Sequence, residues 1–335
     1  MKYVKMVKTS KWLAVMAMTV CLAAAFGSLC RAENTYEPFI RIDGDDPAAF
    51  GNALKNVRII SGDRFEFKGT DPKYGIDPDF VPVTEGLDTL NISASAQYGE
   101  QQFYKLADAI REAAGDREVY VFDLRRESHA ILNGIPFSLY ALHNWSNEGM
   151  SSEEVQAAEA EMFGALVGTT ITAHPKEEDA PGDGFDYEII SCMTEKELVE
   201  SRGFHYIRIP VTDHSWPEPE QVDEFVDFAK GVDMDDVWLH FHCHAGKGRT
   251  VLYTMMYDKM KNPDVPMMDI IVRQTLLGGT YPLYTKTSDN YKVPKYEEKA
   301  RMTELFFRYV DENIDSNYAI SWSEWLRTQA LEDAA

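Results

Sequence analysis

The nine residues His242-Cys243-His244-Ala245-Gly246-Lys247-Gly248-Arg249-Thr250 follow the apolar, strand-like run 237–241, about two-thirds of the way along a chain of 335 residues. Five residues separate the cysteine from the arginine. With so few side chains in this interval, we expect backbone N–H groups to line a small cavity, turned inward by positive φ angles at Gly246 and Gly248. Arg249 adds a planar guanidinium that matches two phosphate oxygens. The stretch therefore predicts an anion-binding loop around a nucleophilic sulfur.

The residues from Arg249 to Tyr257 have the pattern of a helix. The N-terminus of such a helix attracts the same anion and favours the thiolate form of Cys243. Strand 237–242 would deliver Cys243 to the carboxyl end of a parallel sheet, where open α/β folds hold their ligands. Thr250 is placed to hydrogen-bond the sulfur as it leaves, and His242 to orient the loop from behind. The predicted chemistry is transfer of a phosphoryl group onto sulfur.

A second segment supplies a candidate acid. Residues 204–210 read as a strand, and the following loop contains Asp213, His214, Trp216 and Pro217. We expect Asp213 to swing over a bound phosphate, with Trp216 and Pro217 as hinge and anchor. A general acid of this kind contributes roughly 10² to 10⁴ in rate, and the same carboxylate can later activate water.

These segments resemble the protein-tyrosine-phosphatase-like cysteine phytases, secreted bacterial enzymes that remove phosphates from myo-inositol hexakisphosphate. The resemblance extends to 212–217, to 123–134 and to 317–326, and covers nearly the whole chain after residue 32. It implies an α/β fold with a tyrosine-phosphatase core and a small accessory partial β-barrel, and no metal cofactor. The nucleophile, phosphate-binding arginine and general acid of that family carry over to Cys243, Arg249 and Asp213.

The loop departs from that family at His244 and Lys247. The family resemblance implies an acidic residue at the first position and an apolar residue at the second. The pattern Cys-x-x-Gly-Lys-x-Arg instead resembles the loop of the phosphatase and tensin homologue, a phosphoinositide phosphatase. A lysine in the loop adds a point charge for neighbouring phosphates, which favours polyphosphorylated inositol over phosphotyrosine. The candidate substrate-binding residues are His244, Ala245, Gly246, Lys247 and Gly248 of the loop, together with His214, Asp123, Arg58, Lys286 and Lys292.

Some of these residues have alternative interpretations. The resemblance implies substrate contacts for Lys286 and Lys292, yet both lie in a charged stretch that is equally typical of a solvated face. Residues 125, 127 and 129 follow a strand, and they either touch substrate, brace the catalytic loop or form a purely structural ion-pair network. Residues 240, 242, 243 and 244 are metal-ligand types, but successive strand residues point to opposite faces, so we expect no zinc site. Cys192 is either a small buried residue or a disulfide partner that inactivates Cys243.

The N-terminus predicts export. Four lysines precede an apolar run from Trp12 to about Cys30, and Cys30-Arg31-Ala32 offers small residues before a cut, so residues 1–32 read as a signal peptide. An uncleaved anchor is the alternative, whereas a lipoprotein is disfavoured because Leu29 precedes Cys30. Cleavage removes five basic residues and leaves 28 against 55 acidic ones, a net charge of −27. Such a surface excludes nucleic acid and anionic membranes as partners, and the location is periplasmic or extracellular.

Residues 33–335 are predicted to form one tyrosine-phosphatase-like domain, with accessory strands drawn from 55–70 and 168–192. Helices are expected over 103–114, 221–230, 267–277 and 297–313, and capping boxes at Ser151 and Thr194 open two more.

Three candidate functions are compatible with the sequence. The leading one is a phosphatase that acts on a small polyanionic substrate, an inositol polyphosphate, through phosphocysteine. A protein-tyrosine or phosphoinositide phosphatase with the same loop is the second, and a noncatalytic phosphate-binding module is the third.

Overall fold

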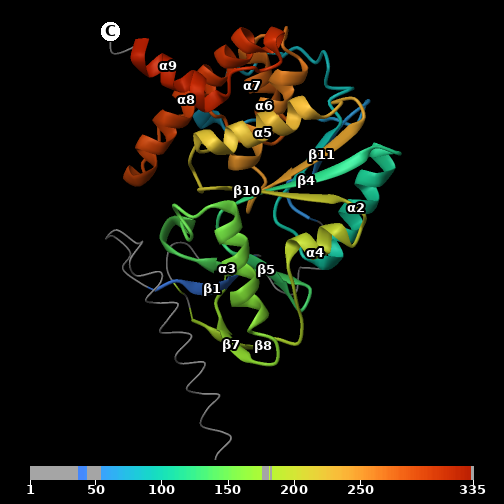
Figure 1. Cartoon of the computed structure of the whole chain (residues 1–335), viewed down its shortest axis with the longest axis vertical. Helices are drawn as coiled ribbons and strands as arrows, with labels where there is room; N and C mark the ends of the chain where they lie inside the picture. Colours follow the sequence, from blue (N-terminus) through green and yellow to red (C-terminus); the bar gives the residue numbers. More distant parts are fainter. Residues whose placement is uncertain (1–36, 44–53, 176–180, 182, 333–335) are drawn as a thin grey trace, which may run out of the picture.

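The described residues contain two principal β-sheets of different character and a third sheet of only two strands (Figure 1). The structure is a computed structural model that describes residues 37–43, 54–175, 181 and 183–332. The larger sheet has the strand order β10-β4-β11-β3-β2, and the smaller has the order β1-β6-β5-β9. The predicted signal peptide, residues 1–32, lies outside the described residues. Among the residues that are described, no helix combines the length and the apolar character needed to cross a membrane.

The larger sheet places the nucleophile loop at its centre. Strand β11 (Val237–His242) is parallel to β4 (Glu118–Arg125) on one side and to β3 (Ile92–Ser95) on the other. Strand β10 (His205–Val211) extends the parallel set, and β2 (Arg58–Ile60) closes the other edge in antiparallel register. All six residues of β11 are buried, as expected of a strand covered on both faces. The chain therefore emerges from the middle of the sheet at Cys243.

Helices cover both faces of this sheet (Figure 1). One face packs against α5 (Pro219–Gly231), α6 (Gly248–Lys261), α7 (Met267–Leu276), α8 (Val293–Asn313) and α9 (Trp322–Glu332). The other packs against α2 (Glu100–Ala114) and α4 (Glu195–Glu200). Because side chains alternate between the two faces of a strand, the apolar residues form one core on each face of the sheet. Phe122 and Phe241 face the first group of helices, whereas Val121 and Trp238 face the second. These layers confirm the predicted α/β fold class.

The smaller sheet is antiparallel and has its own core. It comprises β1 (Phe39–Ile42), β5 (His129–Leu132), β6 (Ile135–Tyr140) and β9 (Cys192–Met193). Helix α3 (Ser152–Gly164) and the hairpin of β7 (Thr170–Ala173) and β8 (Phe185–Glu188) enclose a separate apolar cluster with it. This unit stands where the resemblance implies an accessory partial barrel.

One prediction about these strands is wrong. Residues 55–70 were expected to supply accessory strands, but β2 pairs with β3 at the edge of the larger sheet. The rest of that segment is irregular, and Lys68 donates its N–H to the carbonyl of Leu276 at the end of α7. In place of 55–70, strands come from 39–42 and from 129–140, where Asn133 and Gly134 both adopt positive φ and fold β5 onto β6. The other predicted range, 168–192, contains β7 and β8 and the start of β9.

The predicted helix boundaries are largely confirmed. At the start of α3, the Ser151 hydroxyl accepts the N–H of Glu154 and the Glu154 carboxylate accepts the N–H of Ser151. Thr194 and Glu197 make the same reciprocal bonds at α4. The connections contain short 3-10 helices at Pro72–Tyr74 (η2), Leu142–Asn144 (η3), Asn290–Lys292 (η4) and Ile314–Ser316 (η5).

Strand β10 forms one edge of the larger sheet, and side chains occupy its last backbone carbonyls. The Ser152 hydroxyl donates to the carbonyl of Arg208 at 3.0 Å. The carbonyl of Pro210 accepts from Arg126 Nε and from Gln221 Nε2, both at 2.7 Å. Pro210 itself has no N–H to offer.

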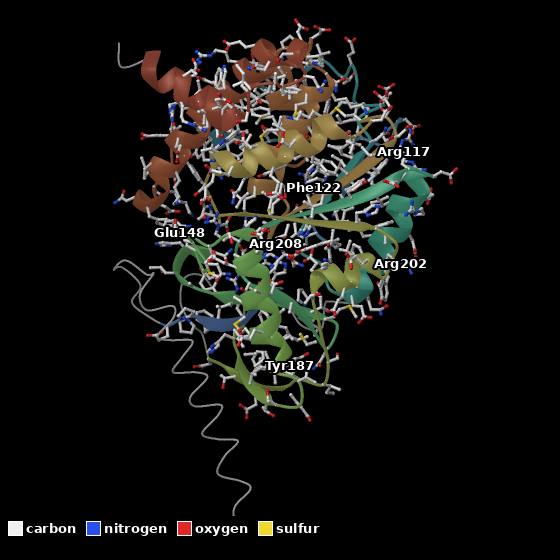
Figure 2. The ribbon with its side chains drawn as sticks, viewed as in Figure 1. Arg117, Phe122, Glu148, Tyr187, Arg202 and Arg208 are labelled. Carbon is white, nitrogen blue, oxygen red and sulfur yellow. The ribbon has the colours of Figure 1, made fainter. Side chains whose placement is uncertain are left out.

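Charged side chains fill the junction between the two sheets. Figure 2 shows Arg208 at this junction, with Phe122 in the layer above and Tyr187 in the layer below. Arg208 Nη1 lies 2.7 Å from Asp123 Oδ2, and its Nη2 lies 3.4 Å from Glu159 Oε2. Because these groups are buried, each charge requires a partner. The junction is therefore an ion-paired layer between two apolar cores.

Candidate active site

The loop between β11 and α6 has the predicted positive φ at Gly246 but not at Gly248. Gly246 has a φ of 66°, and a Cβ there would overlap the backbone of Ser95 and Ala96. Only glycine fits that position. Gly248 does not have a positive φ; it is the first residue of α6, with open space around its Cα. The prediction of positive φ at Gly248 is wrong, because the helix already begins there.

The carbonyl groups of the loop are held on its outside. Gln97 N–H donates to the carbonyl of His244 at 3.1 Å, and Asn56 Nδ2 donates to that of Ala245 at 2.8 Å. Arg58 Nη1 donates to the carbonyl of Gly246 at 2.8 Å. In a trans peptide the C=O and the following N–H point in opposite directions, so the next three N–H groups face the inside of the loop. This orientation builds the predicted anion cradle.

The Cys243 thiol lies at the start of this cradle and is 3% exposed. Thr250 Oγ1, on the first turn of α6, lies 3.2 Å from its sulfur, in hydrogen-bonding geometry. No disulfide joins the two cysteines of the described part of the chain. Cys192 lies in β9 of the smaller sheet, where burial raises the pKa of its thiol to about 11. The sulfur of Cys243 is thus available as a nucleophile.

Arg249 is held in a fixed orientation by Glu127. Its Nη1 and Nη2 donate to the two carboxylate oxygens of Glu127 at 2.7 and 3.0 Å. Arg125 Nε donates to the same carboxylate at 2.8 Å. Burial opposes ionisation of Glu127, but the two arginines outweigh it and hold its pKa well below the ordinary value. Of the alternatives for residues 125, 127 and 129, the structure favours bracing of the loop.

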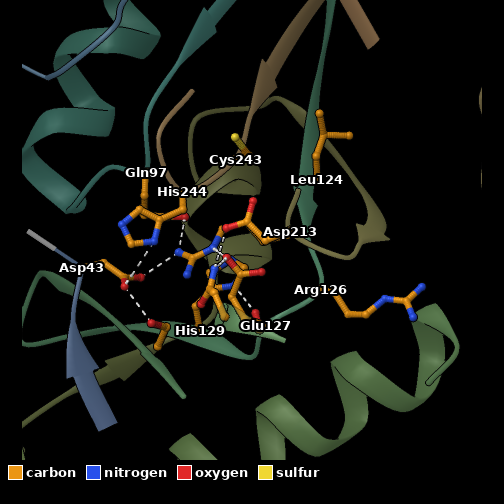
Figure 3. A network of polar contacts seen from close by, with 12 residues as sticks. Asp43, Gln97, Leu124, Arg126, Glu127, His129, Asp213, Cys243 and His244 are labelled. Carbon is orange, nitrogen blue, oxygen red and sulfur yellow. Dashed lines mark hydrogen bonds and ion pairs between the residues drawn. The ribbon is translucent and has the colours of Figure 1, made fainter. Parts of the chain in front are cut away.

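Asp213 lies next to the same guanidinium. Figure 3 shows its side chain in the same group of polar residues as Glu127. Its Oδ1 is 3.4 Å from Arg249 Nε and accepts the N–H of His214 at 3.0 Å. Its Oδ2 accepts a hydrogen bond from Asn144 Nδ2 at 3.2 Å. Burial raises the pKa of the carboxyl, but the charge of Arg249, helped by His214 and Asn144, outweighs it and holds the pKa below the ordinary value. The loop is anchored by Trp216, which packs against Phe306 and Trp322.

Asp123 does not line the loop, contrary to its prediction as a substrate contact. It is fully buried, and its Oδ2 accepts hydrogen bonds from Tyr206 and pairs with Arg208, both at 2.7 Å. It lies inside β4, and its side chain points into the ion-paired layer. His129 Nε2 lies 3.0 Å from the same oxygen. Because protein groups surround its carboxylate, Asp123 has a structural role in the layer beneath the nucleophile loop.

His242 lies in the same layer, directly before the nucleophile. Its Nε2 is 2.6 Å from Glu195 Oε1, and Glu195 also accepts hydrogen bonds from Tyr98, Gln97 and His129. Strand β11 therefore connects through Glu195 to α4 and to β5. This placement is consistent with the predicted role of His242 in orienting the loop from behind.

The only metal-like grouping among the described residues is Asp123, His129 and Glu195, which is fully buried. Tyrosine, glutamine and arginine donors already engage its carboxylates. Burial opposes charging of His129, but Asp123 and Glu159 outweigh it and raise the pKa of His129 to about 10. With its carboxylates engaged by these donors, the cluster is an ion-pair network. His240 is separate, with Nδ1 2.9 Å from Ser93 Oγ.

The predicted cationic residues differ in how close they come to the loop. Arg58 is buried against Gly246, and burial lowers its pKa to about 10. His214 is half-buried beside Asp213, and Lys292 acts on it electrostatically. Lys292 forms an ion pair with Asp289 at 2.6 Å. His244 Nδ1 lies 3.2 Å from Arg41 Nη2 of β1. Ala245, Lys247 and Lys286 are exposed, the last on the segment between α7 and η4.

Sequence reasoning missed several residues of the site. Asn56, Gln97, Asn144 and Trp145 all bond to the nucleophile loop or the acid loop, and Lys299 is buried close enough to Asp213 to be affected by its charge. Burial lowers the pKa of Lys299 to about 8. Three of these residues are amides in segments without a periodic pattern, so no local signal marks them.

Comparisons with known proteins find a family model, curated proteins and solved structures that are similar to this chain. The family model PTP-like phytase, described as "Inositol hexakisphosphate", matches residues 122–261. Among curated proteins, effector protein hopD2 of Pseudomonas syringae pv. tomato is 30% identical over 256 residues, 74% of this chain and 54% of that protein.

Two solved structures are similar over most of the chain. The PTP-like myo-inositol phosphatase of Mitsuokella multacida, solved in complex with myo-inositol-(1,3,4,5)-tetrakisphosphate, is 35% identical with a TM-score of 0.80 and covers 92% of this chain. The PTP-like phytase of Bdellovibrio bacteriovorus is 27% identical with a TM-score of 0.65, and the match covers 88% of this chain and 97% of that one. This chain spans about half the length of the Pseudomonas and Mitsuokella proteins, 54% and 52% respectively.

Proposed function

We propose, from the premise that the chain belongs to the protein-tyrosine-phosphatase-like phytase family, that it hydrolyses phosphate monoesters of myo-inositol through a phosphocysteine intermediate. The observation that carries the proposal is the convergence of three groups on one anion-binding loop. Thr250 contacts the Cys243 sulfur at 3.2 Å, and Arg249 lies 3.4 Å from Asp213. Nucleophile, phosphate ligand and acid therefore meet at one loop.

In the first step, the Cys243 thiolate attacks phosphorus while the bond from phosphorus to the ester oxygen breaks. The departing alkoxide takes the proton of Asp213, and the phosphoryl group remains on sulfur. The inward N–H groups of the loop and the Arg249 guanidinium stabilise the charge on the equatorial oxygens. In the second step, Asp213 accepts a proton from water, the water oxygen bonds to phosphorus, and the thiolate leaves with a hydrogen bond from Thr250.

The charge of the substrate prepares Asp213 for the first step. Arg249 holds the pKa of this carboxyl low in the free protein. A phosphate dianion in the loop pairs with Arg249 and places negative charge near the carboxyl, and both effects raise its pKa. Asp213 is then protonated when a substrate is bound and ionised after the leaving group has departed.

A substrate with several phosphates suits the surroundings of the loop. Lys247 is exposed at the loop, and Lys292 and the buried Lys299 both act electrostatically on His214 beside the acid. A chain with 55 acidic and 33 basic residues concentrates positive charge here. The Mitsuokella relative was solved with an inositol tetrakisphosphate. We therefore place myo-inositol hexakisphosphate and lower inositol polyphosphates first among the substrates.

The test compares purified wild type with Cys243→Ser on three substrates: myo-inositol hexakisphosphate, a phosphotyrosine peptide and a soluble phosphoinositide headgroup. We expect turnover of the inositol hexakisphosphate by wild type, unchanged by EDTA, and no turnover by the variant, which should still bind it. Rapid acid quench during turnover should recover phosphate covalently attached to position 243. Turnover confined to the phosphotyrosine peptide would overturn the substrate assignment, and full activity of Cys243→Ser would overturn the mechanism.

We also propose that residues 1–32 direct export to the periplasm or the medium and are then removed. Support comes from the basic, apolar and small-residue sections of this segment. N-terminal sequencing of the protein recovered from periplasmic and culture fractions should begin at Glu33. Recovery of the intact N-terminus in the membrane fraction would instead identify an uncleaved anchor.

A further inference from the structure

A short segment of the smaller sheet reaches across to the acid loop. Residues 143–145 lie shortly after the end of β6 at Tyr140, in the last part of η3 and the residue that follows it. Trp145 Nε1 donates to the carbonyl of Asp213 at 3.1 Å. The His143 ring stacks on Tyr291 of η4, with 3.5 Å between ring centroids and 12° between planes. Asn144 lies between them, buried and with a φ of 64°. The segment is therefore fixed at both flanks while it presents one amide to the site.

The amide of Asn144 joins the two carboxylates of the site. Its Nδ2 donates to Glu127 Oε1 at 2.9 Å and to Asp213 Oδ2 at 3.2 Å. Glu127 in turn makes the paired hydrogen bonds with Arg249. One nitrogen thus fixes the distance between the acid and the partner of the phosphate-binding arginine. The other Asp213 oxygen is engaged by the N–H of His214.

We propose that Asn144 is a positioning residue, which holds the Asp213 carboxyl against the nucleophile loop and sets the pH at which that carboxyl can act as an acid. The proposal rests on the phosphatase function argued above. An N–H that donates to a carboxylate stabilises its charged form, so Asn144 keeps Asp213 ionised until substrate arrives. The charged and titratable groups around Asp213 are Arg249, Glu127, His214, Lys299 and Tyr296.

The chain provides a matched control for Asn144. Asn147 is also a buried asparagine with a φ of 64°, three residues later in the same connection. Its Nδ2 donates to the carbonyl of Arg126 at 3.0 Å and to Ser128 Oγ at 2.8 Å. Glycine and aspartate both tolerate positive φ. The variants Asn144→Gly, Asn144→Asp and Asn147→Gly therefore change side chains without backbone strain.

The first measurement needs no substrate. Titration of the Asp213 carboxyl carbon by NMR, assigned with Asp213→Asn, should show a pKa higher by about one pH unit in Asn144→Gly, because a hydrogen bond to the carboxylate is lost. Asn144→Asp should raise it further by placing a third negative charge beside Glu127. Asn147→Gly should leave it as in wild type. An unchanged value in Asn144→Gly, or an equal change in Asn147→Gly, would overturn the proposal.

The second measurement separates positioning from general loss of structure. An aryl phosphate whose leaving group needs no proton is compared with an alkyl phosphate that needs one. Asn144→Gly should lose about 10- to 100-fold on the alkyl ester and less than about 3-fold on the aryl ester, because misplacement affects proton transfer alone. Equal losses on both esters would show a structural role and overturn the proposal. If wild type cleaves neither ester, the phosphatase function fails, while the titration still decides the role of Asn144.

Discussion

The nucleophile loop and the acid loop meet at Arg249, but they are held in place by different means. The nucleophile loop leaves a strand that is buried throughout, and Gly246 fits closely against the neighbouring strand. The acid loop leaves the edge strand β10, and its carboxyl is fixed by Arg249, His214 and Asn144. The conformation of the first loop thus depends on the close backbone fit of Gly246, whereas the position of the acid in the second depends on hydrogen bonds and charges around its carboxyl.

This difference means that the two loops should respond to different changes. Apolar packing and glycine conformation are insensitive to pH, while ion pairs in a buried layer depend on the protonation of each member. Arg208, which precedes the acid loop, belongs to that layer through Asp123 and Glu159. His242, which precedes the nucleophile loop, pairs with Glu195 in the same layer, but the fit of Gly246 against Ser95 and Ala96 involves no charge. The conformation of the nucleophile loop should therefore change less with pH than the position of the Asp213 carboxyl.

The largest effect is expected from removing the acid itself. Asp213→Asn should lower the rate of alkyl phosphate hydrolysis by roughly 10² to 10⁴, because no proton reaches the leaving oxygen. The alkaline fall in the pH–rate profile that Asp213 causes should also disappear. Steady-state kinetics from pH 4 to 8 measure both. An unchanged profile would show that another residue supplies the proton and that the acid loop is misassigned.

A methyl group tests the backbone fit of the nucleophile loop. Gly246→Ala should lower activity by about 10²-fold on aryl and alkyl esters alike, since the loop must move to relieve the clash with Ser95. Gly248→Ala is the control, because it has open space and its φ is not positive. Equal activity of the two variants would mean that the glycine fit does not define the cradle.

The ion-paired layer below the acid loop should contribute strongly to the stability of the fold. Arg208→Met should lower the free energy of unfolding by about 3 to 5 kcal/mol, because it leaves Asp123 and Glu159 buried without their cation. Arg64→Met breaks an exposed pair with Glu112 and should cost less than about 1 kcal/mol. Urea unfolding of both variants gives the comparison. Similar small losses would show that the layer contributes little to stability.

The smallest expected effect is a slope of stability with pH. The pKa of His129 is raised to about 10, so its contribution is complete below about 6.5, the unfolded value, and is lost as pH rises towards 10. Between pH 6.5 and 8 this loss amounts to about 2 kcal/mol. In His129→Gln, urea unfolding at a series of pH values should lack this part of the slope. A variant with the wild-type slope would contradict the charged state of His129.

The features predicted correctly from sequence are those that depend on nearby residues. The cysteine loop, strand 237–242 and the capping boxes at Ser151 and Thr194 all follow from short patterns. The hairpin of β5 and β6 had an equally local signal, since Asn133-Gly134 favours a two-residue turn. The sequence analysis did not use this signal and so missed the hairpin over 129–140.

The errors concern what distant segments do to a residue. Asp123 has a residue type and a position that suit substrate binding, but Arg208 and Tyr206 from β10 enclose it. Asn144 has no sequence signal, because its importance depends on Glu127 and Asp213 meeting in space. Buried polar residues acquire partners from the tertiary fold, and a single sequence does not reveal those partners.

The side chains that occupy the carbonyls at the end of β10 limit how the protein can associate with other chains. A free sheet edge invites strand addition, the first step towards aggregates of stacked strands. Ser152, Gln221 and Arg126 already engage the carbonyls of Arg208 and Pro210. An incoming strand would have to displace three hydrogen bonds and would find no donor at the proline. The end of β10 nearest the acid loop should therefore resist pairing with a strand of another molecule, even in concentrated solution.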